Sequence, residues 1–167
     1  AAGVEDVRSR TENRPINISV TPAFATNWLM PRIGSFWKQY PDISLNINPE
    51  IKNVDLVRDN FDVAIRFGNG DWPNLNVVPL TDGNFIVVSH PNLVANMEVS
   101  CLKDLEHLPW LMEPHMMEKR AIVETEGLDL DKANVTRFDN NGLVLSGVLA
   151  GLGVSVQPSS LVAREIE

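Results

Sequence analysis

Residues Pro15 to Arg66 read PINISVTPAFATNWLMPRIGSFWKQYPDISLNINPEIKNVDLVRDNFDVAIR, and this stretch decides the fold. Isoleucine and valine alternate with polar residues over 16–20, and a similar alternation recurs over 43–47, so both segments are predicted strands. A compact apolar segment over 61–67 predicts a third. Strand–helix–strand units of this kind build a parallel sheet whose strand ends and helix N-termini share one edge. Small ligands bind at that edge in such folds.

Helix signals separate the predicted strands. Thr21 is a predicted N-cap, because Pro22 has no N–H to donate and suits the first helical position. Apolar residues at helical spacing over 29–40 predict one buried stripe, and Pro31 predicts a kink or a late start. A short helix is expected within 54–60.

The second half of the chain predicts another α/β lobe. Its elements alternate again, and Asp139–Asn141 is a predicted helix cap. The expected strands are 85–88, 108–112, 135–138 and 154–156, and the expected helical segments are 101–105, 116–127, 142–150 and a last turn from Pro158. Glycines 147, 151 and 153 fit close packing and a C-cap better than a phosphate cradle.

Composition limits the classes of function. The chain has 167 residues, enough for one domain or two small lobes, and no apolar run long enough to cross a bilayer. Its net charge of -8 repels phosphate backbones, so this chain is a poor candidate for gripping nucleic acid. Cys101 is the single cysteine, which excludes an internal disulfide and fits a reducing compartment.

Sequence motifs for catalysis are missing. Gly68–Gly70 lacks the third glycine and the following helix that a dinucleotide site needs. His90, His107 and His115 are too widely spaced for a helical pair of metal ligands, and no serine lies in a G-x-S-x-G turn. The sequence therefore predicts no catalytic residue, no metal site and no cofactor.

Two helix N-termini are candidate anion sites. Thr21 places a hydroxyl at the ligand edge, next to the unpaired amides of Ala23 and Phe24. Asp139–Asn141 repeats the arrangement in the second lobe. Simple capping is the alternative at each position.

Arg66 is a third candidate, because a charge at the end of a buried strand is costly unless it is paired. Its partner is either a ligand anion or a carboxylate such as Glu50 or Asp62. Trp37 and Tyr40, on the first helix, are the favoured residues for a contact between subunits.

Four segments together resemble a known family. They are TPAFATNWLMPRIGSFWKQYPDISLNI, FDVAIRFGNGDWPNL, VVSHPNLV and FDNNGLVLSGVLAGLGVSVQP. They occur in the order found in the effector-binding domains of LysR-type transcriptional regulators and span roughly residues 15–164. The chain most resembles the subgroup of glycine-cleavage, tryptophan-synthase and β-lactamase regulators.

The resemblance implies two Rossmann-like α/β lobes around an effector cleft, as in type 2 periplasmic binding proteins. The first lobe would cover 15–80 and the second 81–157, after a linker end at 1–14. Residues 158–167 would begin a return to the first lobe, whose remainder is absent. The effector site would include Thr21, Pro22, Ala23, Phe24, Glu50, Arg66, Phe67, Glu113, His115, Met116 and Asn140.

The implied function is that of a cytoplasmic sensor. A small anionic or zwitterionic effector would close the lobes of a homodimer or homotetramer, with Ile33, Trp37 and Tyr40 at the dimer interface. DNA would be bound only through an N-terminal winged helix-turn-helix, which is absent from this chain, and no membrane would be involved. The alternative is a solute-binding protein of a transport system; an enzyme on the same frame is more distant.

Overall fold

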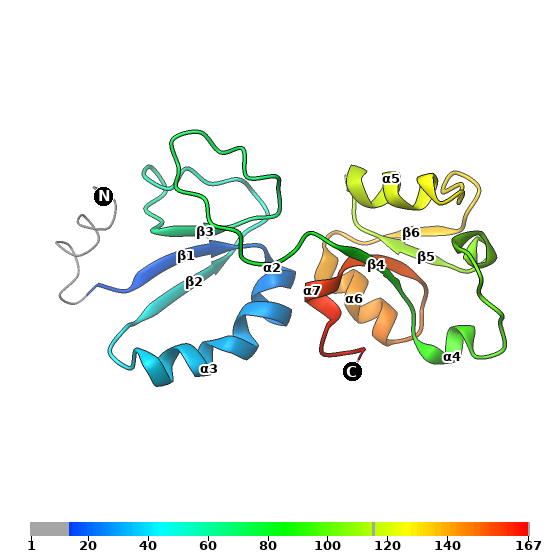
Figure 1. The fold of residues 1–167 in the computed structure, drawn as a ribbon, viewed down its shortest axis with the longest axis horizontal. Coiled ribbons are helices and arrows are strands. Elements are labelled where there is room, and N and C mark those ends of the chain that lie inside the picture. The colour runs from blue at the N-terminus through cyan, green and yellow to red at the C-terminus, as the bar shows by residue number, and fades with distance from the viewer. Residues whose placement is uncertain (1–13, 115, 167) are drawn as a thin grey trace. The chain divides into compact units, whose positions relative to one another are not determined.

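The computed structural model describes residues 14–114 and 116–166 (Figure 1). The chain forms two compact units, residues 1–71 and 72–167, and each contains both strands and helices. The α/β class predicted from the sequence is confirmed. Apart from Arg14, the predicted linker end lies outside the described residues. The predicted lobe boundary after Leu80 and the return after Gln157 stay predictions.

Three parallel strands form the sheet of the first unit (Figure 1). They are β1 (Ile16–Val20), β2 (Leu45–Pro49) and β3 (Val63–Ile65). β1 lies in the middle, and its Ile18 is aligned with Ile47 on one side and Val63 on the other. The strands therefore end at one edge of the sheet, as the sequence predicted. β3 is shorter than the predicted segment 61–67.

A continuous helical run connects β1 to β2. Its segments are α2 (Pro22–Phe24), the π-helical turn η1 (Ala25–Leu29) and α3 (Met30–Gln39). Pro31 has no N–H for the carbonyl four residues earlier, and its ring clashes with that carbonyl. The π turn accommodates the proline because each of its hydrogen bonds joins an N–H to the carbonyl five residues earlier. The bond from the Met30 N–H to the Ala25 oxygen is an example. The helix does not start late, since the run is continuous from Pro22, and the π turn is how it accommodates Pro31.

The helix expected within residues 54–60 does not form, and the segment is a series of turns. The Asp55 carboxylate accepts the N–H groups of Val57 at 3.1 Å and Arg58 at 2.9 Å. Asp59 in turn accepts the Asp55 N–H at 2.8 Å. These are the bonds of an N-cap, and the Asp59 N–H donates to the Asp55 carbonyl at 2.8 Å, so one helical turn begins. Asn60 then adopts a left-handed φ of 58° and ends it. The prediction was wrong because the chain leaves the helical conformation at Asn60 after a single turn, which the spacing of the apolar residues does not reveal.

The second unit contains two pairs of strands with helices between them. Its elements are β4 (Phe85–Val88), α4 (Pro91–Val94), the 3₁₀ turn η2 (Leu102–Leu105), β5 (Trp110–Met112), α5 (Met117–Thr125), β6 (Val135–Arg137), α6 (Asn141–Leu149), β7 (Ser155–Pro158) and α7 (Ser159–Val162). β5 and β6 are parallel, whereas β4 and β7 are antiparallel. A bridge between Trp110 and Val154 connects the pairs. Each predicted strand and helix of this half has a counterpart.

Trp110 is at the centre of the second unit's core. Its side chain is fully buried, and its indole N–H donates to the Leu105 carbonyl at 3.0 Å. Gly153 passes so close to this strand that a Cβ there would lie 2.6 Å from the Pro109 oxygen. Gly151 has a φ of 75°, a left-handed value that favours glycine. Close packing and a C-cap therefore explain these glycines, as predicted.

Candidate functional site

Each parallel strand of the first unit ends next to a residue that the sequence nominated. Thr21 follows β1, Glu50 follows β2 and Arg66 follows β3. The register aligns the last residues of β2 and β3 with Val20, the last residue of β1. The three candidates therefore share the carboxyl edge of one sheet. This edge is the candidate site of the first unit.

The helix N-terminus after β1 offers hydrogen-bond donors. Thr21 is the N-cap, but its side chain makes no capping hydrogen bond, so capping does not occupy the hydroxyl. Pro22 has no N–H, and the amides of Ala23 and Phe24 lie in the first turn, where no intrahelical acceptor exists. The Phe24 ring stacks on Trp28, with the ring centroids 4.9 Å apart. The Phe24 ring therefore packs along the same helical run, and the donor that Phe24 offers is its backbone N–H.

The Arg66 guanidinium is bonded only to neutral oxygens. Nη1 donates to the Ile65 carbonyl at 2.8 Å, and Nη2 donates to Ser19 Oγ at 2.7 Å and to the Lys52 carbonyl at 3.0 Å. Nε is buried and has no hydrogen-bond partner among the described residues. Over that part of the chain Arg66 forms no ion pair. Phe67, the next residue, is 54% exposed.

Glu50 and Asp62 were the carboxylates considered as alternatives to a ligand anion. Neither forms an ion pair with Arg66. Asp62 binds Arg14 at 2.6 Å and accepts the Asn17 N–H at 2.9 Å. Glu50 is exposed and acts on Arg66 only through space. Burial lowers the pKa of Arg66, and the charge of Glu50 raises it by less. The cation is therefore under-compensated, and a bound anion would restore part of its lost solvation.

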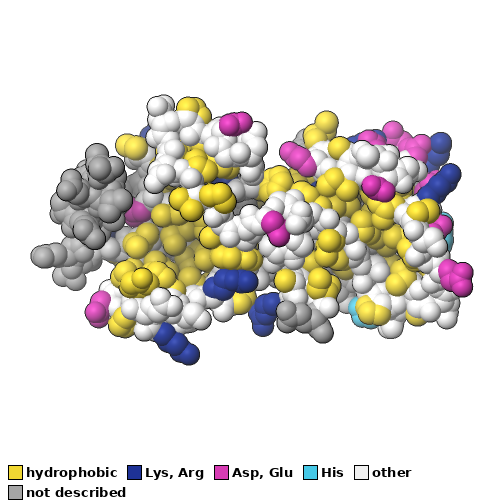
Figure 2. All heavy atoms as spheres, viewed as in Figure 1, with side chains coloured by type: hydrophobic (Ala, Val, Ile, Leu, Met, Phe, Trp, Pro, Cys, Tyr) yellow, Lys and Arg dark blue, Asp and Glu magenta, His cyan; other side chains and the backbone are white. Residues whose placement is uncertain are grey.

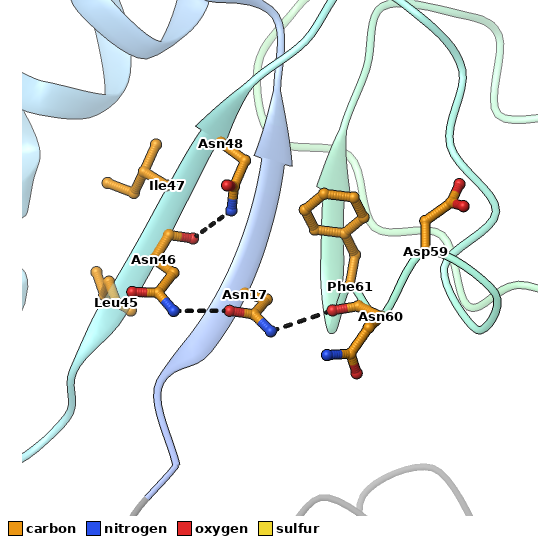
Figure 3. A pocket seen from close by; sticks show the side chains of 8 residues that line it. All are labelled: Asn17, Leu45, Asn46, Ile47, Asn48, Asp59, Asn60 and Phe61. Carbon is orange, nitrogen blue, oxygen red and sulfur yellow. Dashed lines mark hydrogen bonds between the residues drawn. The ribbon is translucent and has the colours of Figure 1, made fainter.

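A row of asparagines covers the polar face of the same sheet (Figure 3). Asn46 Nδ2 donates to Asn17 Oδ1 at 3.0 Å, and Asn17 Nδ2 donates to the Asn60 carbonyl at 3.1 Å. Asn48 Nδ2 also bonds the Asn46 carbonyl at 3.3 Å. They line a hollow of about 410 Å³ together with Leu45, Ile47, Asp59 and Phe61. The asparagine side chains bond to other members of this row. None of the predicted site residues lines the hollow.

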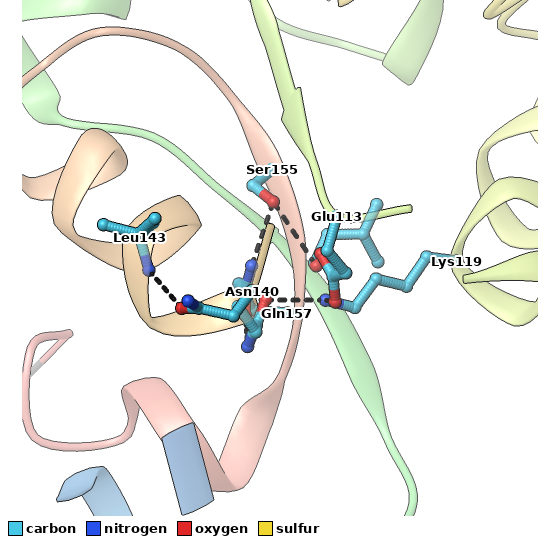
Figure 4. Close-up of polar contacts among 8 residues, drawn as sticks. Glu113, Lys119, Asn140, Leu143, Ser155 and Gln157 are labelled. Carbon is cyan, nitrogen blue, oxygen red and sulfur yellow. Dashed lines mark hydrogen bonds and ion pairs between the residues drawn. The ribbon is translucent and has the colours of Figure 1, made fainter. Parts of the chain in front are cut away.

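In the second unit, Asn140 is a helix cap. It is the N-cap of α6, and its Oδ1 accepts the Leu143 N–H at 3.0 Å (Figure 4). The capping alternative is thus observed here, in contrast to Thr21. Met116 is half-buried at the N-cap of α5. His115 lies outside the described residues.

Glu113 belongs to a buried polar network that the sequence analysis missed (Figure 4). Lys119 Nζ donates to Glu113 Oε1 at 2.6 Å and to Asn141 Oδ1 at 3.0 Å. Asn141 Nδ2 donates to Gln157 Oε1 at 2.8 Å, and Gln157 Nε2 donates to Ser155 Oγ at 2.9 Å. Burial lowers the pKa of Lys119, while the charge of Glu113 and its hydrogen bond raise it. The network joins the end of β5 to α5, α6 and β7.

One signal in the sequence pointed to Lys119. It lies four residues before Val123, and both side chains are buried, at 1% and 0% exposure. A lysine on the apolar stripe of a helix needs a buried partner. The sequence does not say which carboxylate supplies it, because Glu113 precedes the helix.

The predicted dimer residues differ in exposure. Trp37 and Tyr40 are 46% and 50% exposed, whereas Ile33 is 5% exposed and packs inside the first unit. In this conformation Ile33 is not available to another chain. Figure 2 shows apolar side chains gathered on the surface of this unit. The interface itself stays a prediction.

The described residues contain no cluster of histidine, cysteine or carboxylate side chains that could hold a metal ion. None of their helices is long and apolar enough to cross a membrane. The features present are hydrogen-bond donors, one under-compensated cation and a buried ion pair. Such groups suit contact with a small polar ligand.

Comparison with known proteins gives the family. The LysR substrate binding domain model matches residues 9–167, so the chain belongs to that family. The "AhcY transcriptional activator HvrB" of Rhodobacter capsulatus is 32% identical over 161 residues, covering 96% of this chain and 55% of that protein. The "Glycine cleavage system transcriptional activator" of Escherichia coli is 31% identical over 165 residues, covering 96% and 53%. The chain therefore spans about half the length of these curated relatives.

Solved structures agree on the fold. The effector-binding domain of AmpR from Citrobacter freundii has a TM-score of 0.77 at 25% identity, covering 92% of this chain and 77% of that one. The effector domain of AmpR from Pseudomonas aeruginosa has a TM-score of 0.75 at 25% identity, covering 92% and 74%. The predicted two-lobed α/β fold and the predicted family are confirmed.

Proposed function

We propose that this effector-binding domain recognises the anionic group of a small metabolite at the carboxyl edge of its first unit. Arg66 would supply the positive charge, and Thr21 would supply a hydroxyl next to the amides of Ala23 and Phe24. The observation that carries the proposal is the Arg66 guanidinium, which bonds only neutral oxygens and leaves a buried Nε without a partner among the described residues. A carboxylate or phosphate is the complementary group.

The size of the expected effect follows from charge-assisted hydrogen bonding. Such bonds contribute about 1.5–3 kcal/mol, which corresponds to roughly 10- to 150-fold in affinity. The under-compensated charge of Arg66 favours the upper part of that range. Thr21 contributes a neutral hydrogen bond, so its removal should cost less.

In the full-length protein, the effector would act through its different affinity for two arrangements of the subunits. We propose that effector binding closes the two lobes in a homodimer or homotetramer. DNA would be bound by an N-terminal winged helix-turn-helix that is not part of these residues. Such a regulator acts in the cytoplasm, where its DNA lies, and needs no catalytic step. The named relatives are transcriptional activators, which does not favour a transport-linked solute-binding protein.

A thermal-stability screen of the full-length protein tests the proposal. Metabolite acids are compared with their uncharged methyl esters, so that only the anion differs within a pair. The acid of at least one pair should raise Tm and its ester should not, and Arg66→Gln should abolish the increase. Equal increases from acid and ester, or an unchanged response in Arg66→Gln, would contradict the proposed site.

A further inference from the structure

Ser19 is a fully buried polar residue of the first unit that contacts the cation of the candidate site. It is the last residue but one of β1, and its side chain is 0% exposed. Its Oγ accepts a hydrogen bond from Arg66 Nη2 at 2.7 Å. A buried hydroxyl is costly unless it is hydrogen-bonded, and Arg66 supplies that bond. Ser19 is thus covered from solvent but acts directly on the arginine.

The sheet directs the Arg66 side chain toward Ser19. The register aligns Ser19 with Asn48 on β2 and Ala64 on β3, neither of which carries a charge. Arg66 follows Ala64 by two residues, so their side chains project from the same face. Nη2 also donates to the Lys52 carbonyl at 3.0 Å, so neutral oxygens engage both of its hydrogens. The guanidinium is therefore held in one orientation between β1 and the loop after β2.

The two arginines near the ends of β3 differ in the charge of their partner. Asp62 precedes β3 and binds Arg14 at 2.6 Å, whereas Arg66 follows β3 and forms no ion pair within the described residues. A carboxylate compensates the charge of Arg14. The Ser19 hydroxyl instead accepts a hydrogen bond without adding negative charge. It orients the Arg66 guanidinium and leaves its charge available to a ligand.

We propose that Ser19 is the positioning residue of the anion site and that its lack of charge determines the charge class of the effector. With a hydroxyl at position 19, the guanidinium is fixed in place and attracts an anion. A carboxylate there would form an internal ion pair with Arg66 and close the site to anions. The inference rests on the proposed function and adds the residue that keeps Arg66 both fixed and uncompensated.

The test uses the full-length protein with succinate and phosphate as anionic probes, and dimethyl succinate and trimethyl phosphate as their uncharged counterparts. At least one anion should raise the Tm of the wild type more than its ester does. Ser19→Asp should abolish this difference, because the new carboxylate neutralises Arg66. Ser35→Asp adds the same charge at an exposed position of α3 and should keep the difference.

Ser19→Ala separates positioning from charge, because it keeps the Arg66 cation uncompensated but removes the hydroxyl acceptor. Calorimetry should show that its affinity for the stabilising anion falls about threefold or more, the size of one neutral hydrogen bond. A role in packing alone would lower the Tm of Ser19→Ala without changing that affinity, and this result would overturn the inference.

A further measurement needs no ligand. The carboxylate of Ser19→Asp is buried alone when Arg66 is removed, so Ser19→Asp/Arg66→Gln should lose more Tm than the two single shifts add up to. Additive shifts would overturn the inference. When Arg66→Gln loses the anion response but Ser19→Asp keeps it, the proposed function stands and this inference falls. If neither anion stabilises the wild type, or if Arg66→Gln leaves the response unchanged, the proposed function falls and takes the inference with it.

Discussion

Lys119 Nζ lies 2.6 Å from Glu113 Oε1, and both side chains are buried in the second unit. A buried ion pair of this kind contributes little net stability, because each charge was removed from water to form it. Removing one partner is different, since the other charge is then buried alone. The pair is therefore best tested by comparing single and double substitutions.

Lys119→Met should lower the free energy of unfolding by about 3–5 kcal/mol, because it leaves the Glu113 charge uncompensated. Glu113→Met/Lys119→Met should recover most of that loss. Urea titration followed by circular dichroism measures both. A double variant as unstable as the single one would mean that packing by the lysine, not its charge, determines the effect.

Gly153→Ala should destabilise the protein by about 1–3 kcal/mol, because the new methyl group meets the Pro109 oxygen at 2.6 Å and the Leu111 side chain at 2.9 Å. Gly34→Ala is the matched control. Its Cβ meets nothing within 4 Å, and Gly34 lies inside α3, so alanine should stabilise by about 0.5–1 kcal/mol. Thermal unfolding of the two variants should thus shift in opposite directions. A shift in the same direction would contradict the close approach at Gly153.

Asp104 should make stability depend on acid pH. Its carboxylate accepts the N–H groups of Ser100 at 2.8 Å and Cys101 at 2.9 Å, and these bonds, chiefly that of Cys101, lower its pKa from the ordinary 3.8. A carboxyl group with a lowered folded pKa stabilises fully above its unfolded value and loses that effect as pH falls through the folded value. The wild type should therefore exceed Asp104→Asn in urea midpoint at neutral pH, and the difference should shrink below about pH 3.8. Glu98→Gln is an exposed control in the same unit. A difference that is constant with pH would contradict the bonding of Asp104.

Trp37→Glu/Tyr40→Glu should weaken self-association of the full-length protein, because it places two charges on the exposed apolar end of α3 and its C-cap. Light scattering after gel filtration measures the mass over a dilution series. Gln39→Glu adds one charge on the same helix and should have a smaller effect. If the double variant keeps the wild-type mass at every dilution, these residues are not at the interface.

The sequence predicted the elements where one physical signal dominates. Alternating isoleucines gave β1, and Asn140 followed by an apolar run gave the start of α6. It failed at residues 54–60, where the Asp55 carboxylate caps a single turn and the left-handed Asn60 ends that turn before a helix forms. The spacing of apolar residues shows where a helical turn can form. It does not show where the backbone leaves the helical conformation.

The candidate site was predictable only in part for a related reason. Their places after predicted parallel strands put Thr21 and Arg66 at one edge, and the structure shows both there. Glu50, which entered as an alternative partner of Arg66 and through the resemblance, lies at the same edge. Whether a side chain is already satisfied depends on tertiary neighbours. Both residues are N-caps, but only the Asn140 side chain makes a capping hydrogen bond. Lys119 was missed because its partner Glu113 lies outside its helix.

The most direct test of the account is the dissociation constant of an acid that stabilises the full-length protein, measured by calorimetry for the wild type, Arg66→Gln and Arg58→Gln. Both substitutions remove one positive charge from the first unit, but the side chain of Arg58 is 77% exposed. We expect Arg66→Gln to weaken binding by about 10-fold or more and Arg58→Gln to change it by less than about 2-fold. Equal affinities for Arg66→Gln and the wild type would contradict the assignment of the anion site.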